Sequence, residues 1–338
     1  MARECPLPDV WRGLEGKVRC VQQQSATVFT ASCPSCGGDY HANGEPSDRF
    51  IFWVEYDGDK LIANGSCRQC GYKVWADELD DSLSKPSPED RARWEAKAAA
   101  YQAQQMRRAQ RALDHIERMR EQRLHELYNA NVAGSAKAQA YWARRGLDMK
   151  WVDFWQLGYC EHKEWWTRQT GPFRCNSATI PIFGPDWDLL NIRHRLIDAP
   201  DTVGKYRPEV ATGQSYIFRT DPSHPLTGDV IVVEGELKAA VLHSRLQSPE
   251  LGIIGIPGVT PGDEMITETL ANAERITLIM DPGAREPAWE LCKKLGKDRC
   301  WVLIPPLKVD DGILASQMDK AELHRLIRNA KPAGRQVA

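Results

Sequence analysis

From residue 229 onward, short apolar runs alternate with longer stretches of helical character. The apolar runs VIVV, GIIGI, ITLIM and CWVLI have the length and the branched side chains of buried strands. The segments that follow them read as helices: LKAAVLHSRL, DEMITETLANAE, EPAWELCKKLG and ILASQMDKAELHRLIRNA. Strands that alternate with helices in this way predict an α/β domain, in which helices flank a parallel sheet joined by right-handed crossovers.

The pattern upstream is different. Residues 135 to 220 mix helical segments with short strands such as ATIPIFG and DLLNIRHRLI. Residues 91 to about 131 contain no Pro or Gly and are dominated by Ala, Gln, Arg and Glu, which predicts one long helix or a helical hairpin. Ser87 and Pro88 are suited to begin that helix. Its basic side chains are most simply a solvated face.

Nearer the amino terminus, DRFIFWVEYDGDKLIANG alternates around the turn YDGD, as expected of a β-hairpin. A Cys-x-x-Cys pair stands on each side of it, formed by Cys33 with Cys36 and by Cys67 with Cys70. Two such pairs place four thiolates within tetrahedral reach of one Zn²⁺. The segment is therefore predicted to be a β zinc ribbon with one structural zinc. The alternative, a thioredoxin-like redox pair, does not explain two pairs.

Composition and charge say less about the class of protein than these patterns do. The 338 residues suffice for two or three compact domains, and a formal net charge of −2 neither favours nor excludes a nucleic-acid partner. No apolar run approaches the roughly 20 residues that span a bilayer. The opening MARECPLPDVWRGLEG lacks the apolar region of a secretory signal. We therefore expect a cytoplasmic protein without a membrane partner, in which ten cysteines favour thiols or metal ligands over disulfides.

Carboxylates follow three of the four predicted strands. Glu234 ends the first, Asp281 follows the third, and Asp310 with Asp311 follows the fourth. One acid after a strand is commonly a helix cap, but three sets at the carboxyl edge of one parallel sheet are expected to converge. Clustered carboxylates require a cation, and oxygen ligands suit Mg²⁺ or Mn²⁺. Such sites serve phosphoryl transfer.

The segments VVEGELKAAVL, IMDPGAREPAWEL and KVDDGIL occur in the order of the three motifs of the TOPRIM domain. Residues 229 to 318 thus resemble the TOPRIM domains of primases, topoisomerases and related nucleases. The resemblance implies that Glu234 is the catalytic glutamate and that Asp281 takes the first aspartate position of the second motif. In the last motif, Asp311 corresponds to a metal ligand and Asp310 could substitute for a missing one.

The second motif departs from the family pattern. Gly283 stands where a second aspartate is usual, and a slip of two residues would instead put Asp281 in the second position and leave the first apolar. Lys238 also occupies a position that is often acidic in bacterial primases. One carboxylate is therefore missing from this pair, which could reduce metal affinity or activity.

The middle of the chain extends the resemblance to bacterial and phage primases over most of residues 31 to 318. AQAYWARRGLDMKWVDFWQLGYC is similar to a primase segment with a Tyr-Leu-x-x-Arg-Gly core, and ATIPIFGPDWDLLNIRHRLID with GKYR resembles the strands that follow it. The resemblance implies that Arg195 and Lys205 contact template and nucleotide, with Arg193 and Arg207 as neighbours. Surface salt bridges are the alternative role for each.

The cysteine-rich segment, CPSCGG to CRQCG, resembles the zinc ribbon of these primases, which helps to recognise the template. Arg49, Phe52, Trp53 and Arg68 are candidates for base stacking and phosphate contacts, with hairpin packing as an equal alternative for the aromatic side chains. The expected parts are an N-terminal segment (1–30), the zinc ribbon (31–78), an acidic linker and long helix (79–131), an N-terminal subdomain of a primase core (132–225), a TOPRIM domain (226–330) and a tail (331–338).

Together these features predict a bacterial-type DNA primase, encoded by a phage or mobile element. It would make short RNA primers on single-stranded DNA from nucleoside triphosphates. Asp281, Asp310 and Asp311 would hold Mg²⁺ or Mn²⁺, with Glu234 as general acid/base or further ligand. Because the chain has no G-x-x-x-x-G-K-[ST] loop, a replicative helicase would be a separate partner. The alternatives are a TOPRIM-type nuclease or topoisomerase-like enzyme and, because of Gly283, a non-catalytic nucleic-acid-binding accessory protein.

Overall fold

The computed structural model describes residues 5–37, 48–57, 60–79, 87–167, 170–212, 214–257, 263–316 and 319–333. The chain forms two compact units, whose boundary falls between Met106 and Arg107, within helix α2 (Pro88–Glu121). The long helix predicted from the sequence is thus present. Most of the acidic linker before it, residues 80–86, lies outside the described residues.

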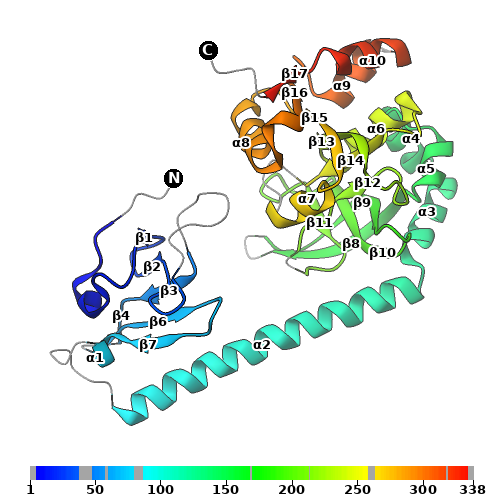
Figure 1. Cartoon of the computed structure of the whole chain (residues 1–338). Coiled ribbons are helices and arrows are strands. Elements are labelled where there is room, and N and C mark those ends of the chain that lie inside the picture. Colours follow the sequence, from blue (N-terminus) through cyan, green and yellow to red (C-terminus); the bar gives the residue numbers. More distant parts are fainter. Residues whose placement is uncertain are drawn as a thin grey trace. The chain divides into compact units, whose positions relative to one another are not determined.

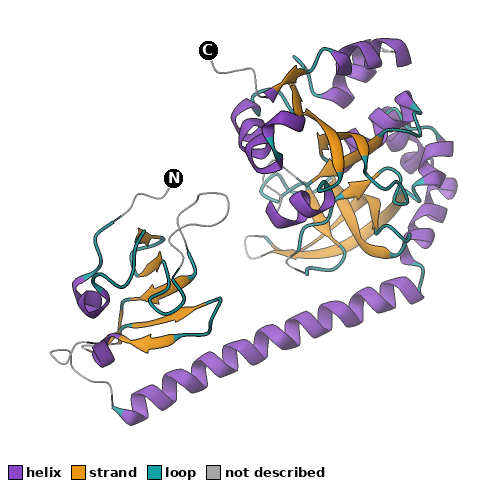
Figure 2. Ribbon diagram, viewed as in Figure 1, coloured by secondary structure: helices purple, strands orange, loops and turns teal. Residues whose placement is uncertain are grey.

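The first unit is built on an antiparallel sheet with strand order β1-β2-β3-β6-β7 (Figure 2). Its strands are β1 (Gln22–Gln23), β2 (Val28–Ala31), β3 (Phe50–Trp53), β6 (Asn64–Cys67) and β7 (Lys73–Trp75). The predicted hairpin is confirmed: β3 pairs with β6, and β4 (Glu55–Asp57) pairs with β5 (Lys60–Ile62) beyond them. The tip of its turn, residues 58 and 59, is not described. The short helices η1 (Asp9–Leu14) and α1 (Ala76–Leu79) complete the unit.

Residues 5–30 are part of this unit. Trp11 and Leu14 of η1 are fully buried, and the ring of Trp11 makes edge contacts with Phe50 and Phe52. Strand β2 also begins at Val28, before the predicted ribbon boundary. The predicted N-terminal segment, residues 1–30, thus contributes side chains to the core of the ribbon. Its few apolar side chains complete the ribbon core, although they follow no period that a sequence pattern could detect.

The second unit begins with helices that pack on an antiparallel sheet. Arg123 adopts a left-handed conformation (φ 48°) between α2 and the next helix, so the helical stretch breaks there. The helices are α3 (Leu124–Gly134), α4 (Ala136–Arg144) and α5 (Met149–Phe154), the last two capped by Ser135 and Asp148. The sheet has the order β11-β10-β9-β8, formed by β8 (Gly158–Thr167), β9 (Gly171–Phe183), β10 (Leu189–Ile197) and β11 (Tyr206–Pro208).

The predicted parallel sheet is confirmed. Strands β13 (Gly228–Glu234), β14 (Gly252–Ile256), β15 (Ala273–Ile279) and β16 (Cys300–Leu303) are parallel, in the order β14-β13-β15-β16. Two short antiparallel strands at its edges were not predicted: β12 (Phe218–Arg219) beside β14 and β17 (Lys331–Pro332) beside β16. Strand β17 lies within residues 331–338, the range that was expected to be a tail. Residues 334–338 lie outside the description.

Five helices accompany this sheet: α6 (Glu236–Leu246), α7 (Asp263–Thr269), α8 (Arg285–Leu295), α9 (Val309–Ser316) and α10 (Lys320–Arg328), with the short turn η2 (Lys297–Arg299) before β16. The single helix predicted at residues 313–330 is two helices. Asp319 begins the second with a capping box, in which its side chain accepts a hydrogen bond from the Glu322 N–H and Glu322 reaches back.

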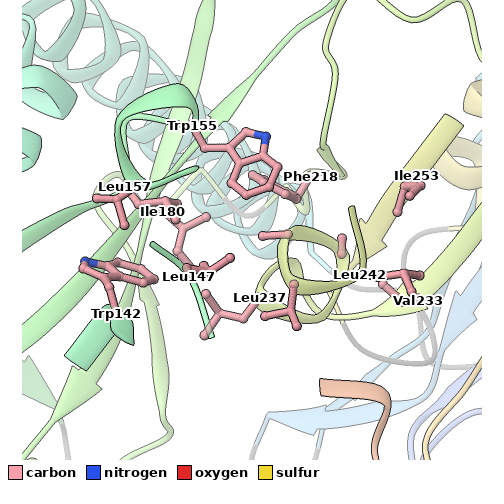
Figure 3. Close-up of a cluster of buried hydrophobic side chains, with 14 of the residues drawn as sticks. Trp142, Leu147, Trp155, Leu157, Ile180, Phe218, Val233, Leu237, Leu242 and Ile253 are labelled. Atoms are coloured by element: carbon pink, nitrogen blue, oxygen red, sulfur yellow. The ribbon is translucent and has the colours of Figure 1, made fainter. Parts of the chain in front are cut away.

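The antiparallel and parallel sheets share one hydrophobic core. Figure 3 shows side chains of α4, β9, β12, β13 and α6 in a single cluster, with Trp142 and Ile180 on one side and Val233 and Leu242 on the other. The Trp155 indole is fixed at its polar end, because its N–H donates to the Thr220 carbonyl at 2.8 Å. This packing allows residues of both sheets to line one cavity.

Candidate active site

A cavity of about 590 Å³ lies where the carboxyl ends of the parallel strands face β10 and β11. It is lined by five acidic and seven basic side chains. The structure brings together there every cavity residue that the sequence predicted: Glu234, Asp281, Asp310, Asp311, Arg193, Arg195, Lys205 and Arg207. The predicted convergence of the three acidic sets is thus observed.

Glu234 is the last residue of β13, and the turn after it places it at the cavity. Gly235 has φ 97°, a conformation that L side chains rarely adopt, and its N–H donates to the Ile256 carbonyl at 2.8 Å. The chain also passes close to Gly255, where an added Cβ would lie 2.7 Å from the Gly235 oxygen. Within the described part of the chain, the half-buried carboxylate of Glu234 has no hydrogen bond or ion pair, so it remains open to a ligand.

Asp281 lies on a tight turn after β15. The Ala284 N–H donates to the Asp281 carbonyl at 3.0 Å, and Gly283 has φ 89°, which with Pro282 before it is the pattern of a type II turn. Glycine at 283 therefore suits the turn. The Asp281 carboxylate pairs with two ammonium groups, Lys238 Nζ at 2.5 Å and Lys308 Nζ at 3.4 Å.

Asp310 and Asp311 lie in the first turn of α9. Asp310 is 8% exposed, and its Oδ1 atom is buried without a hydrogen-bond partner. A buried carboxylate oxygen in this state carries a desolvation cost that a cation would remove. The oxygen donors of Asp310, exposed Asp311 and Glu234 fit Mg²⁺ or Mn²⁺. These carboxylates are not drawn into a tight cluster, because the only such group found among the described residues is the set of four cysteines.

Two of the predicted phosphate-binding arginines already have partners. Arg193 forms an ion pair with Glu236, which is 1% exposed; burial raises the pKa of Glu236 and Arg193 opposes that rise. Arg195 donates to the Tyr206 hydroxyl at 2.9 Å and lies over its ring, 5.5 Å from the ring centroid. Arg193 thus serves first to neutralise a buried acid, whereas Arg195 remains at the cavity wall beside an aromatic face.

The remaining basic residues are more open. Lys205, Arg207 and Arg145 have no ion pair with any residue the structure describes, and Arg207 Nε is buried without a hydrogen-bond partner. A buried guanidinium donor in this state is suited to an anion such as a phosphate. Arg145 and Lys308 were not among the predicted site residues. Both lie in motif segments, YWARRG and KVDDG, but the basic site residues were predicted only from the RHR and KYR segments.

A buried polar network holds β10 from the side opposite the cavity. His194 alternates with Arg193 and Arg195 along the strand, and its Nε2 lies 2.6 Å from the Glu209 carboxylate, which also pairs with Lys163 at 2.5 Å. Burial alone would raise the pKa of Glu209, but the His194 hydrogen bond and the Lys163 ammonium lower it to about 2. Burial lowers the pKa of His194, so we interpret it as the neutral donor of this pair.

The predicted zinc ligands converge in the first unit. Their four ligand atoms all lie within 4.8 Å of one another, with Cys33 Sγ 3.7 Å from Cys70 Sγ and Cys36 Sγ 3.8 Å from Cys67 Sγ. Sulfur atoms at the corners of a tetrahedron lie about 3.8 Å apart when each is about 2.3 Å from a central zinc ion. The four cysteines thus fit one Zn²⁺.

The thiol chemistry agrees with this fit. Burial, followed by the neighbouring thiols, raises the pKa of Cys36 to about 12, whereas a hydrogen bond from the Tyr72 N–H lowers the pKa of Cys70 to about 7. Thiols with such opposed pKa values do not all ionise together at neutral pH unless a cation compensates them. Backbone N–H groups of Ser35 and Gln69 also point at the Cys33 and Cys67 sulfurs, at 3.3 and 3.4 Å.

The ribbon residues considered for template contact separate into two kinds. Phe52 is fully buried and stacks on Phe29 and Phe50, so of its two predicted roles hairpin packing applies. Trp53 is half-buried, and Arg68 is exposed and paired with Asp48 at 3.4 Å. Trp53 and Arg68 therefore remain accessible to a ligand.

Comparison with known proteins shows the fold. No family model and no curated protein matches the sequence. The RNA polymerase domain of Mycobacterium tuberculosis primase DnaG, in complex with double-stranded DNA, matches with a TM-score of 0.51 and 15% identity over 65% of this chain and 82% of that chain. The Aquifex aeolicus primase, comprising zinc-binding and RNA polymerase domains, matches with a TM-score of 0.50 and 16% identity over 96% of this chain and 83% of that one.

A DNA primase domain from Pseudomonas aeruginosa matches with a TM-score of 0.50 and 18% identity over 62% of this chain and 78% of that chain. The resemblance to bacterial primases inferred from the motifs is therefore confirmed at the level of the fold. At these identities the likeness shows how the chain folds, and the chemistry must be argued from the cavity itself.

Proposed function

We propose that this protein is a DNA primase, which joins ribonucleotides on a single-stranded DNA template by metal-dependent nucleotidyl transfer. The observation that carries the proposal is the cavity, where unpaired carboxylates and unpaired basic side chains face each other on a primase fold. A nucleoside triphosphate needs both kinds of group, because its phosphates are anionic and its reaction requires proton removal and a cation.

The reaction forms one bond and breaks one. The 3′-hydroxyl oxygen of the growing primer attacks the α-phosphorus of the incoming nucleotide, and the bond to the bridging oxygen breaks to release pyrophosphate. Glu234 is placed to accept the hydroxyl proton, because its carboxylate has no other partner within the described residues. Asp310 and Asp311 would hold Mg²⁺ or Mn²⁺, which when bound polarises the phosphoryl oxygens.

The basic wall would orient the substrate. Lys205 and Arg145 line the cavity without ion-pair partners among the described residues, so they can contact nucleotide phosphates or the template backbone. Arg195 and Tyr206 present an aromatic and guanidinium surface against which a base could stack. Arg193 would act indirectly, by holding Glu236 at the start of α6.

The ribbon would contribute a structural zinc and template contacts. Trp53 and Arg68 are its accessible candidates, since Phe52 lies in the core. No helix among the described residues is both long and apolar enough to cross a membrane. A separate replicative helicase as partner, and an origin in a phage or mobile element in the host cytoplasm, remain proposals from the sequence.

The test is primer synthesis on mixed single-stranded templates, with labelled nucleotides and either Mg²⁺ or Mn²⁺. We expect short labelled products, and Glu234→Gln should reduce their yield by at least about 100-fold, because it removes the proton acceptor and keeps the shape. Glu290→Gln is the matched control, since Glu290 is on α8, outside the cavity.

The same reactions separate the alternatives. Cleavage of the template without nucleotides would indicate the TOPRIM-type nuclease. Template binding with neither synthesis nor cleavage, by folded and zinc-loaded protein, would indicate the accessory protein and overturn the proposal.

A further inference from the structure

The carboxylates of the cavity are not in equivalent states. Asp310 has a buried oxygen without a partner, whereas both oxygens of Asp281 are used, Oδ1 by Lys238 and Oδ2 by Lys308. The lysines come from different elements: Lys238 from the first turn of α6, and Lys308 from the loop before α9. The side chains of Asp281 and Lys238 are only 17% and 13% exposed, so their pair is partly shielded from water.

The charges around Asp281 disfavour a divalent cation. Two ammonium groups and one carboxylate leave a net positive charge, and a metal ion bound to Asp281 would lie within a few ångströms of both lysines. Like charges at such a distance repel strongly in a site that is partly shielded from water. The orphan oxygen of Asp310 is thus the favoured position for the metal.

The same charges favour an anion. Each lysine ammonium has three donors, and the contacts of Lys238 and Lys308 with Asp281 use one donor on each. The side chain of Lys308 remains 55% exposed, so its ammonium is accessible from the cavity. Lysine binds phosphate as a point charge. Two lysines that are held in place by one carboxylate are therefore positioned to bind a group with several phosphate oxygens.

We propose that Lys238 and Lys308, positioned by Asp281, form the binding site for the pyrophosphate part of the nucleotide, and that the divalent metal is held on the Asp310 side of the cavity. This inference deepens the proposed function and rests on it for the identity of the substrate. When the bond from the α-phosphorus to the bridging oxygen breaks, its electron pair stays on that oxygen. The two ammonium groups neutralise the added charge without transferring a proton. Asp281 is then a positioning residue, contrary to the sequence-based prediction that it binds the metal.

The first test measures binding of inorganic pyrophosphate by calorimetry. It uses the zinc-loaded full chain in buffer without added Mg²⁺ or Mn²⁺. We expect measurable binding, weakened about 10-fold or more by Lys238→Ala and by Lys308→Ala. Lys293→Ala is the matched control, because Lys293 pairs with Glu290 on α8 and is not among the cavity residues. Unchanged affinity in either cavity variant would overturn the proposal.

The second test measures Mn²⁺ binding by the paramagnetic signal of the free ion. Asp310→Asn should lower the affinity at least about 10-fold, whereas Asp281→Asn should leave it within about twofold of the wild type. An equal loss in the two variants would show that Asp281 is a metal ligand and would sink the proposal. Neither test measures synthesis, so its failure is distinguishable from failure of the proposed function. A chain that makes no primers but gives both expected results would retain this anion site and lose the assignment as a primase.

Discussion

The zinc ribbon and the cavity both gather ionisable side chains, but they balance the charges in opposite ways. In the ribbon, four donors of one kind from two short loops lie within 4.8 Å of one another and fit one cation. In the cavity, five acidic and seven basic side chains come from separate segments, and several are already paired with one another. One bound ion would complete the ribbon site. The cavity still needs a ligand that carries negative charge.

Because of this difference, ligand binding should affect the stability of the fold at one site more than at the other. A closed site of soft ligands stabilises the fold around it, because the unfolded chain does not keep the four thiolates together. An open site of mixed charge must stay accessible, so its support comes from elsewhere, here from the shared core and the network behind β10. Zinc should therefore affect stability mainly in the first unit, and the cavity residues should affect ligand binding more than stability.

The largest effect is expected at the ribbon. Cys67→Ser removes one of four zinc ligands, and zinc binding to such sites is worth on the order of 10 kcal/mol. We expect loss of bound zinc and unfolding of the first unit, while the second unit keeps its protection in hydrogen exchange measured by mass spectrometry. Cys5→Ser is the control, since Cys5 is in the same unit but outside the ligand set. Retained zinc in Cys67→Ser would contradict the site, and loss of protection in both units would erase the contrast between them.

An intermediate effect is expected when acid protonates the buried network behind β10, which supports the cavity. Because Glu209 has its pKa lowered from 4.5 to about 2, its stabilisation is complete above pH 4.5 and is lost as the pH falls toward 2, by roughly 3 kcal/mol in all. His194 acts in the same direction at higher pH, since its pKa lies below the ordinary 6.5 and the unfolded chain takes up the proton first.

Hydrogen exchange of second-unit peptides between pH 7 and 2 measures this loss, because the range must include the lowered pKa of Glu209. Glu209→Gln should lower stability at pH 7 and flatten the acid part of the profile. A variant as acid-sensitive as the wild type would place the titrating group elsewhere.

The smallest effect is expected at Gly283. Its φ of 89° makes a side chain strained, although an added Cβ would meet no atom within 4 Å. Gly283→Asp and Gly283→Ala should each cost about 1 kcal/mol in the free energy of unfolding, measured by denaturant titration. The aspartate should not add a Mn²⁺ site, because Lys238 and Lys308 already neutralise the neighbouring Asp281. If only the Gly283→Asp variant bound a second Mn²⁺, the result would indicate that glycine stands at the position of a metal-binding aspartate.

Strong local patterns made much of the fold and both sites predictable. Buried parallel strands are continuous apolar runs, so their ends, and with them Glu234 and Asp281, could be located from the sequence. The four cysteines were equally visible because each Cys-x-x-Cys pair has the spacing of a zinc knuckle. These features depend on residues that are close along the chain or on a repeated arrangement of strands.

The remaining features depend on packing between distant segments. Trp11 completes the ribbon core from a stretch without periodicity, and the two-residue strands β12 and β17 are too short to leave a pattern. The pair formed by Lys238 and Asp281 joins residues 43 positions apart, so the sequence shows an unusual lysine without showing its partner. The prediction that Asp281 binds a metal could therefore take no account of its two lysine partners.

Strand β17 also bears on how the protein can be handled. Pairing of Lys331 and Pro332 with Val302 and Trp301 covers the outer edge of β16. An expression version cut at residue 330 would leave that edge with unpaired N–H and C=O groups, which invite another chain to add a strand. Such a version is expected to form soluble aggregates or to precipitate at concentrations at which the longer chain stays dispersed. Affinity tags should therefore be attached after residue 333, so that they do not replace β17.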